Sequence, residues 1–398
     1  MLCFPETYYD ETMYKPKSLF NRFFIFAWII GLTLGIGQSL FNSIITVFAT
    51  GSGYSTTFAG SLSMGYLVGA LFGRRLGGWT TDMKGRRVGV IIGAVSFLIA
   101  TLIFCLPAAQ ISVMMMILRF MHGFGYGCAT TAYYVMVEDV VPPEKASVGL
   151  GINFTSAGLA FVFSGFMISL CVTGDSYTLL FEVTAAFVAV AVIFGFAENY
   201  EKGRPVVAGR KKKDKDRKFL EPAAVPYAVI VLFYNTGVSL PMFYIVPLAQ
   251  FKGIEDWSFL FTCFAIGMIL GYLIFPRIAA KLNSFFAMLP VYIAGLVGLL
   301  LFLYTKNDTV FNLCGIIYGM TLSSVPVMQH AAVERVPDER KGNATSTLNS
   351  AIDLTMGVGP LIWGILIDAS GYSFPYIFGA ALFVIACVVH FFVEKNAN

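Results

Sequence analysis

Long apolar runs separated by short polar or glycine-containing turns recur along the whole chain. A membrane-spanning helix needs about 20 mostly apolar residues. Twelve windows meet this requirement, at approximately 20–49, 57–79, 88–107, 110–136, 147–171, 177–197, 223–250, 257–277, 284–304, 309–333, 345–367 and 373–393. The first window is too long for a signal peptide and is expected to be retained. The pattern predicts an all-α membrane protein with twelve transmembrane helices.

The composition excludes a soluble protein. Of the 398 residues, 57% are hydrophobic and 13% are charged, whereas soluble domains are about 25% charged. The net charge of +4 is too small to indicate nucleic-acid binding. The seven cysteines form neither a CxxC pair nor a Cys/His cluster, so we expect free thiols, no metal and no cofactor.

The positions of the positive charges predict the orientation in the membrane. With the N-terminus inside, 24 of the 27 Lys and Arg residues, Arg74 and Arg75 among them, fall in cytoplasmic segments or adjoining helix ends. Lys252 and Lys306 fall outside, and Arg119 lies within a span. Cytoplasmic loops are enriched in Lys and Arg. We therefore expect both termini to be cytoplasmic and the protein to be a multi-pass component of the cell (plasma) membrane.

The two halves of the chain resemble each other. Residues 140–151 (VVPPEKASVGLG) and 335–346 (RVPDERKGNATS) align at an offset of 195, and the alignment continues without a gap to Tyr177 and Tyr372. The long polar run between the halves contains GRKKKDKDRK, which is typical of a solvated loop that binds anionic lipid headgroups; a regulatory role is the alternative. We predict six-helix bundles at 1–197 and 223–398, joined by a cytoplasmic linker at 198–222.

The turn after the second span reads GGWTTDMKGRR. It resembles the signature loop of the major facilitator superfamily, G-x-x-x-D-(R/K)-x-G-(R/K)-(R/K), although Met83 stands where a basic residue is usual. The matching residues are Gly78, Asp82, Gly85, Arg86 and Arg87. A glycine at the first position would let two helices approach closely, and the second glycine would permit a tight turn. Asp82 would pair with a basic group and cap a helix N-terminus, forming a cytoplasmic gate.

Two further stretches resemble one branch of that superfamily. The fourth span contains RFMHGFGYGCATT, in which Arg119 and Gly123 match an R-x-x-x-G motif. The eleventh span has Asp353 in mid-helix, within GNATSTLNSAIDLTMGVGPLIWG. Together they resemble the drug-exporter-like (drug:proton antiporter) branch. The fifth span lacks the Gly-Pro helix motif of many such antiporters.

Ionisable groups inside the membrane are costly and are therefore candidates for function. Asp353 is the first candidate for proton coupling, because a carboxylate in a medium of low dielectric favours its protonated form. Glu182 in the sixth span is the second, with exposure to outer water as the alternative. His122 could relay protons or could be a packing group.

Polar side chains in the spans are candidates for a substrate cavity. Gln38 and Asn42 are four residues apart in the first span, which places them on one helix face. The full set of cavity candidates is Arg119, Gln38, Asn42, Tyr126, Asn235, Ser239 and Asn349. Such groups also join helices through hydrogen bonds, and this alternative remains open.

These features predict a secondary transporter that works by alternating access. The first hypothesis is proton-coupled export of small amphipathic organic compounds, with Arg119 as a charge partner of Asp353 or a substrate contact. The alternative is a porter of organic anions or metabolites in which Arg119 binds the substrate anion. The expected partners are a small-molecule substrate, protons and membrane lipids, and the protein is expected to act as a monomer. An enzyme is excluded because no cluster of acid, base or metal-binding residues is present.

Overall fold

The structure is a computed structural model and describes residues 18–142, 145–172, 177–199, 201, 221–254, 257, 259–279, 281–337 and 341–395. All regular elements among these residues are helices, and this part of the chain contains no strand. Eight helical stretches within it are long and apolar enough to cross a membrane. Helices nevertheless occupy all twelve predicted windows, so the predicted all-α fold with twelve membrane helices is confirmed.

The first six long helices follow the predicted windows within a few residues. Their bounds are α1 (Arg22–Gly51), α2 (Thr56–Lys84), α3 (Arg86–Phe104), α4 (Ser112–Val140), α5 (Ala146–Cys171) and α6 (Thr178–Ala197). Asn21 caps α1 and Ser55 caps α2, each through a side-chain oxygen that accepts a backbone N–H. Such caps satisfy N–H groups that have no partner within the helix.

The second half repeats this pattern with one interruption. Its unbroken helices are α7 (Val225–Phe251), α8 (Phe259–Ala279), α9 (Ser284–Tyr304), α12 (Lys341–Ser370) and α13 (Ser373–Lys395). The tenth window, predicted as one helix, is divided into α10 (Asp308–Gly319), a 3-10 turn (Met320–Ser323) and α11 (Val325–Val333). Pro326 lies in the first turn of α11 and offers no backbone N–H to continue the ladder, which accounts for the break.

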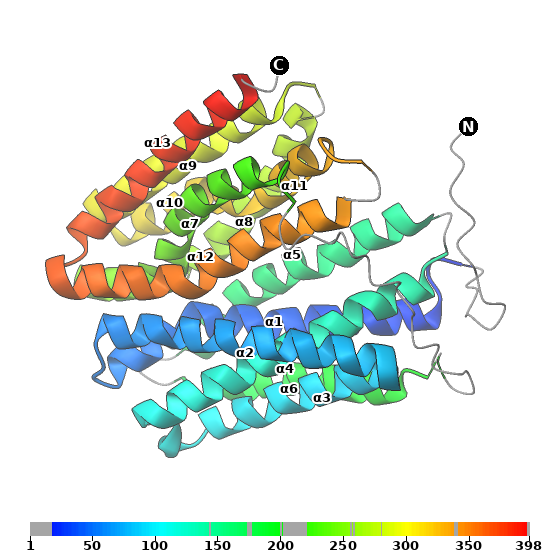
Figure 1. The fold of residues 1–398 in the computed structure, drawn as a ribbon. Coiled ribbons are helices and arrows are strands. Elements are labelled where there is room, and N and C mark those ends of the chain that lie inside the picture. Colours follow the sequence, from blue (N-terminus) through cyan, green and yellow to red (C-terminus); the bar gives the residue numbers. More distant parts are fainter. Residues whose placement is uncertain are drawn as a thin grey trace.

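Helices α1–α6 form the lower part of the molecule in Figure 1, and α7–α13 form the upper part. The offset of 195 found in the sequence reappears in the helix boundaries: α5 and α12 begin at residues 146 and 341, and α6 and α13 begin at 178 and 373. We call the end at which α1 begins and α13 ends the terminal end, and the other the opposite end (Figure 1).

Glycines allow α2 and α4 to pack backbone against backbone. A Cβ at Gly77 would lie 2.6 Å from the carbonyl oxygen of Cys128, and Gly69 and Gly73 face α4 in the same way. The close approach that the sequence suggested at Gly78 is wrong, because no heavy atom of the described residues lies within 4 Å of a Cβ there. One residue along a helix turns the side chain by about 100°, so the packing face runs through Gly77.

The two groups of helices are in contact toward the opposite end. Thr46 near the end of α1 donates a hydrogen bond to the carbonyl oxygen of Phe243 in α7. A Cβ at Gly60 in α2 would lie 2.6 Å from the hydroxyl of Tyr244 and would also meet the carbonyl of Pro360 in α12. The two parts are therefore tightly packed against each other at that end.

Candidate functional site

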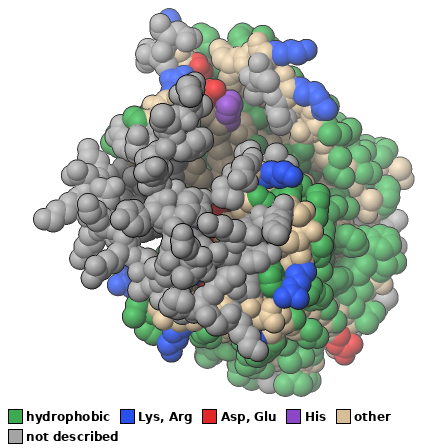
Figure 2. All heavy atoms as spheres, turned by 90° about the vertical axis from the view of Figure 1, so that its right-hand side faces the viewer, with side chains coloured by type: hydrophobic (Ala, Val, Ile, Leu, Met, Phe, Trp, Pro, Cys, Tyr) green, Lys and Arg blue, Asp and Glu red, His purple; other side chains and the backbone are tan. Residues whose placement is uncertain are grey.

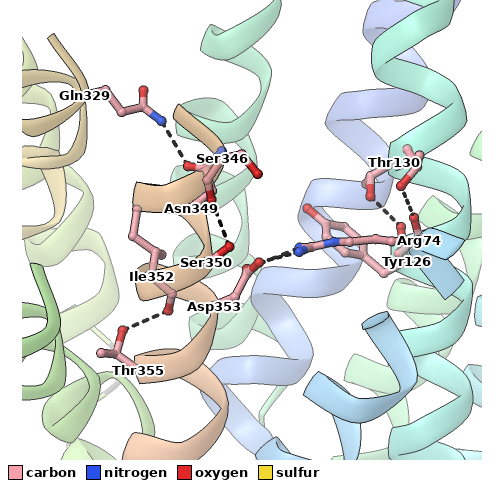
Figure 3. A network of polar contacts seen from close by, with 12 residues as sticks. Arg74, Tyr126, Thr130, Gln329, Ser346, Asn349, Ser350, Ile352, Asp353 and Thr355 are labelled. Carbon is pink, nitrogen blue, oxygen red and sulfur yellow. Dashed lines mark hydrogen bonds and ion pairs between the residues drawn. The ribbon is translucent and has the colours of Figure 1, made fainter. Parts of the chain in front are cut away.

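An ion pair between Arg74 of α2 and Asp353 of α12 joins the two parts. Nη2 of Arg74 lies 3.2 Å from Oδ1 of Asp353, and Nη1 donates to Oδ2, so the pair is bidentate. Figure 3 shows Arg74 reaching across to Asp353 with Tyr126 beside it. The side chains are 42% and 30% exposed, so water partly screens the pair and its contribution to stability is small.

Exposure along α12 shows where the two parts separate. On the face toward α2, Ser346 and Ser350 are exposed, Asp353 is half-buried, and Gly357 and Pro360 are buried. On α2 the same trend runs from buried Gly60 through half-buried Leu67 to exposed Arg74. The facing sides of α2 and α12 are therefore accessible toward the terminal end, and Arg74 and Asp353 lie at the inner limit of this accessible region. We call this region the terminal cleft and the ion pair its apex.

Arg119 is fully buried in α4. Its Nη2 lies 3.2 Å from Oδ1 of Asn42, and its guanidinium stacks on the ring of Tyr66 at 4.8 Å from the centroid. Nε and Nη1 have no hydrogen-bond partner in the described part of the chain, and neither does the buried Oε1 of Gln38, one turn before Asn42. Unpaired buried polar groups are costly. The unpaired donors of Arg119 are suited to an anion, whereas the Oε1 of Gln38 requires a hydrogen-bond donor.

Tyr66 and Tyr126 connect Arg119 with the apex of the terminal cleft. Their ring centroids are 6.4 Å apart, and both residues are half-buried. Tyr66 lies under the guanidinium of Arg119, and Tyr126 lies beside Arg74 (Figure 3). Exposure thus falls from Arg74 through the two tyrosines to Arg119.

The other proton-coupling candidates lie away from the terminal cleft. His122 is fully buried among the rings of Phe41, Phe97 and Phe104, with centroid distances of 4.2, 4.8 and 5.3 Å, and its Nε2 lies 3.2 Å from the hydroxyl of Thr101. Glu182 is exposed one turn into α6, near the opposite end. The packing alternative for His122 and the water-facing alternative for Glu182 match these positions.

The polar cavity candidates of the second half bind to neighbouring helices. Asn235 donates to the hydroxyl of Thr355, and Ser239 accepts a 3.0 Å hydrogen bond from Nε1 of Trp363. Both residues are buried between α7 and α12. Asn349 differs, because it is exposed in the terminal cleft, where it accepts a 3.0 Å hydrogen bond from Gln329 of α11 (Figure 3).

The loop after α2 contacts the first half and the start of the linker. Gly85 has a φ of +97°, which glycine adopts without strain. The carboxylate of Glu201 accepts hydrogen bonds from the backbone N–H groups of Arg86 (3.0 Å) and Arg87 (3.1 Å), and so caps α3. Arg86 also pairs with Asp139 of α4 at 2.8 Å. The side chain of Asp82, for which the capping role was predicted, lies outside the described residues.

The fold, the loop after α2 and the site residues all belong to a chain that matches one protein family. The model of the Major Facilitator Superfamily matches residues 27–350 and 313–398. The chain belongs to this superfamily. It is a transporter and not an enzyme, and it is a multi-pass protein of the cell membrane. Transporters of this superfamily move small-molecule substrates. The described residues contain no group of three or more His, Cys, Asp or Glu side chains that could hold a metal.

Relatives within the superfamily differ in their substrates. The chain is 23% identical over 404 residues to the cis,cis-muconate transport protein of Acinetobacter baylyi, covering 94% of both chains. It is 26% identical over 172 residues to multidrug resistance protein 3 of Bacillus subtilis, covering 42% of this chain and 33% of the relative. The crystal structure of a POT family transporter in complex with 5-aminolevulinic acid has the same fold, with a TM-score of 0.78, 13% identity and coverage of 97% and 99%. The resemblance to the drug-exporter-like branch is therefore not specific.

Within this superfamily fold, two residues of the site were missed in the sequence. Arg74 was counted among the charges at cytoplasmic helix ends, but it lies ten residues before the end of α2, and it rather than Arg119 is the partner of Asp353. The sequence does not single out Tyr66. Tyr66, Ala70 and Arg74 are spaced four residues apart, which places them on one helix face. This spacing is the sequence pattern that indicates a shared site for Tyr66 and Arg74.

Proposed function

We propose that this protein is a proton-coupled secondary transporter of small organic anions. The observation that supports the proposal is Arg119, a fully buried guanidinium with two nitrogens that lack partners in the described residues. A carboxylate supplies two acceptor oxygens and a negative charge, and so satisfies a guanidinium better than a neutral ligand does. The full-length relative that is named for transport of muconate, an organic anion, agrees with this substrate class.

Asp353 is the proposed proton carrier. Its side chain pairs with Arg74, and this pair links α2 to α12. A proton on Asp353 would remove the charge that holds Arg74 and would weaken the link between the two parts. Protonation at the apex of the terminal cleft would in this way be coupled to their relative movement.

The proposed orientation places the terminal end in the cytoplasm. Figure 2 looks onto this end and shows Lys and Arg side chains scattered over it. The exposed basic residues there include Arg22, Lys84, Lys145, Lys281 and Lys395, as expected for a cytoplasmic face. The moving units would be the bundles 1–197 and 223–398, joined by the linker 198–222, and one chain would suffice for transport.

Proton-coupled export of amphipathic compounds is the second candidate. It is favoured by the similarity to multidrug resistance protein 3, which covers less than half of this chain. Against it stands the pairing of Asp353, whose carboxylate is engaged by Arg74 and is not free to attract a cationic compound.

The experiment uses the purified protein in liposomes that contain a pH-sensitive dye. We expect carboxylates such as benzoate or adipate, added at pH 7, to move protons across the membrane together with the anion. Asp353→Asn should abolish proton movement, and Arg119→Lys should reduce transport because lysine keeps the charge but loses the planar fork. The matched control is Arg75→Gln, which removes an exposed charge next to Arg74.

Two results would overturn the proposal. Transport of amphipathic cations without transport of any carboxylate would favour the export hypothesis. Carboxylate transport that is unchanged in Arg119→Lys and in Arg119→Met would show that the anion binds elsewhere.

A further inference from the structure

Two arginines of the first half lie at different depths along one line of side chains. Arg119 stacks on Tyr66, Tyr66 neighbours Tyr126, and Arg74 lies beside Tyr126 at the apex of the terminal cleft (Figure 3). Tyr66 and Arg74 are eight residues apart on α2, which corresponds to about 12 Å along the helix axis. The rings of Tyr66 and Tyr126 thus lie between the two arginines in this line of side chains.

We infer that the substrate is a linear dicarboxylate bound at both ends, one carboxylate on Arg119 and the other on Arg74 in place of Asp353. This inference rests on the proposed function and specifies its substrate class. The hydrocarbon chain between the carboxylates would lie against the rings of Tyr66 and Tyr126, whose faces provide apolar contact.

The charges of these three groups favour a dianion when Asp353 is protonated. With Asp353 ionised, the two arginines and the aspartate carry a net charge of +1, which a monocarboxylate on Arg119 neutralises while Asp353 keeps Arg74. With Asp353 protonated they carry +2, which a dicarboxylate neutralises, whereas a monocarboxylate leaves Arg74 without an anion. A charge left unpaired in a partly buried site is unfavourable.

Competition for Arg74 determines whether the proton and the substrate are transported together. The second carboxylate and the ionised Asp353 compete for Arg74, whose Nη1 and Nη2 both bind Asp353 in the structure. A proton on Asp353 removes the competitor, so proton and dianion each increase the affinity of the site for the other. Ligands that favour each other's binding occupy the site together, and we therefore expect symport.

The first experiment measures dissociation constants in detergent at pH 7, where simple carboxylates are ionised. The probes are adipate and cis,cis-muconate as dicarboxylates and butyrate and benzoate as monocarboxylates. We expect the dicarboxylates to bind at least about tenfold more tightly, and Arg74→Gln to remove this preference while changing monocarboxylate binding little. Arg75→Gln is the control and should leave the preference intact.

Proton uptake in weakly buffered solution provides a second readout. Adipate should cause uptake of about one proton per dianion in the unaltered protein and none in Asp353→Asn. If Arg74→Gln does not fold, the double variant Arg74→Gln/Asp353→Asn removes both charges of the ion pair. The ratio of dicarboxylate to monocarboxylate affinity in this double variant then tests whether Arg74 causes the preference for dicarboxylates.

The outcomes separate this inference from the proposed function. If no carboxylate binds, the proposed function fails and the inference fails with it. If monocarboxylates bind as tightly as dicarboxylates, or if removal of Arg74 leaves their affinity ratio unchanged, organic-anion transport stands and only two-ended recognition is overturned.

Discussion

The carboxylate of Asp368, near the end of α12, caps the first turn of α2 at Thr56. It accepts the backbone N–H of Thr56 at 3.1 Å, that of Thr57 at 2.8 Å, and the hydroxyl of Thr56 at 2.6 Å. The hydroxyl of Tyr244 in α7 lies 2.9 Å from the carbonyl oxygen of Thr56. A negative charge at a helix N-terminus is favourable, so this contact between the two parts helps to close the opposite end.

Removal of this cap should make the opposite end open more often. We expect Asp368→Ala to shift the population toward states open at that end by about tenfold or more, because hydrogen bonds to a charged group are lost. Spin labels at Ser52 and Ser370 would report the distance across that end. Asp308→Ala is the control, since Asp308 lies in the first turn of α10 within one part, and an equal change in both variants would contradict the prediction.

Replacement of Arg119 by an apolar residue should increase the stability of the protein and abolish anion binding. Arg119→Met removes a buried charge with two unpaired nitrogens, and we expect the substrate-free protein to become more stable by about 1–3 kcal/mol while anion binding is lost. Thermal unfolding in detergent would measure it. Arg335→Met should lower the stability, because Arg335 pairs with Glu394 at 3.1 Å. A loss of stability in Arg119→Met would show that its stacking on Tyr66 outweighs the unpaired nitrogens.

The adjacent glycines at the end of α2 should differ in their tolerance of alanine. A Cβ at Gly77 would lie 2.6 Å from the Cys128 carbonyl oxygen and 3.0 Å from its Cα, whereas Gly78 has open space. Gly77→Ala should therefore lower stability, because α2 and α4 must separate by several tenths of an ångström. Gly78→Ala should be neutral or slightly stabilising. Similar melting temperatures for the two variants would contradict this assignment of the packing face.

A buried polar cluster should hold α13 against α7 and α9. Glu394 accepts hydrogen bonds from Ser284 at 2.6 Å, Tyr227 at 3.0 Å and Arg335 at 3.1 Å. Glu394→Ala would leave three donors without their acceptor, and we expect a loss of at least about 1–3 kcal/mol. Thermal unfolding would again measure it, with exposed Lys395→Ala as the neighbouring control. If both variants unfold at the same temperature, the cluster contributes nothing to stability.

The sequence alone determined the helices and part of the site. The length and number of spans follow from local apolar composition, which the membrane enforces on each segment separately, and the offset of 195 was visible before the boundaries of α5 and α12 were known. Arg119 and Asp353 were identifiable because charged groups inside a span are expensive.

Only the tertiary structure decided which side chains meet. Asp353 pairs with Arg74, 279 positions earlier in the chain, and no local pattern links two such residues. Adjacent positions point in directions about 100° apart on a helix, so the choice of Gly77 over Gly78, or of Arg74 over Arg75, depends on where the neighbouring helix lies. The terminal cleft is likewise a property of how the two parts are arranged, because it arises from contacts made at one end only.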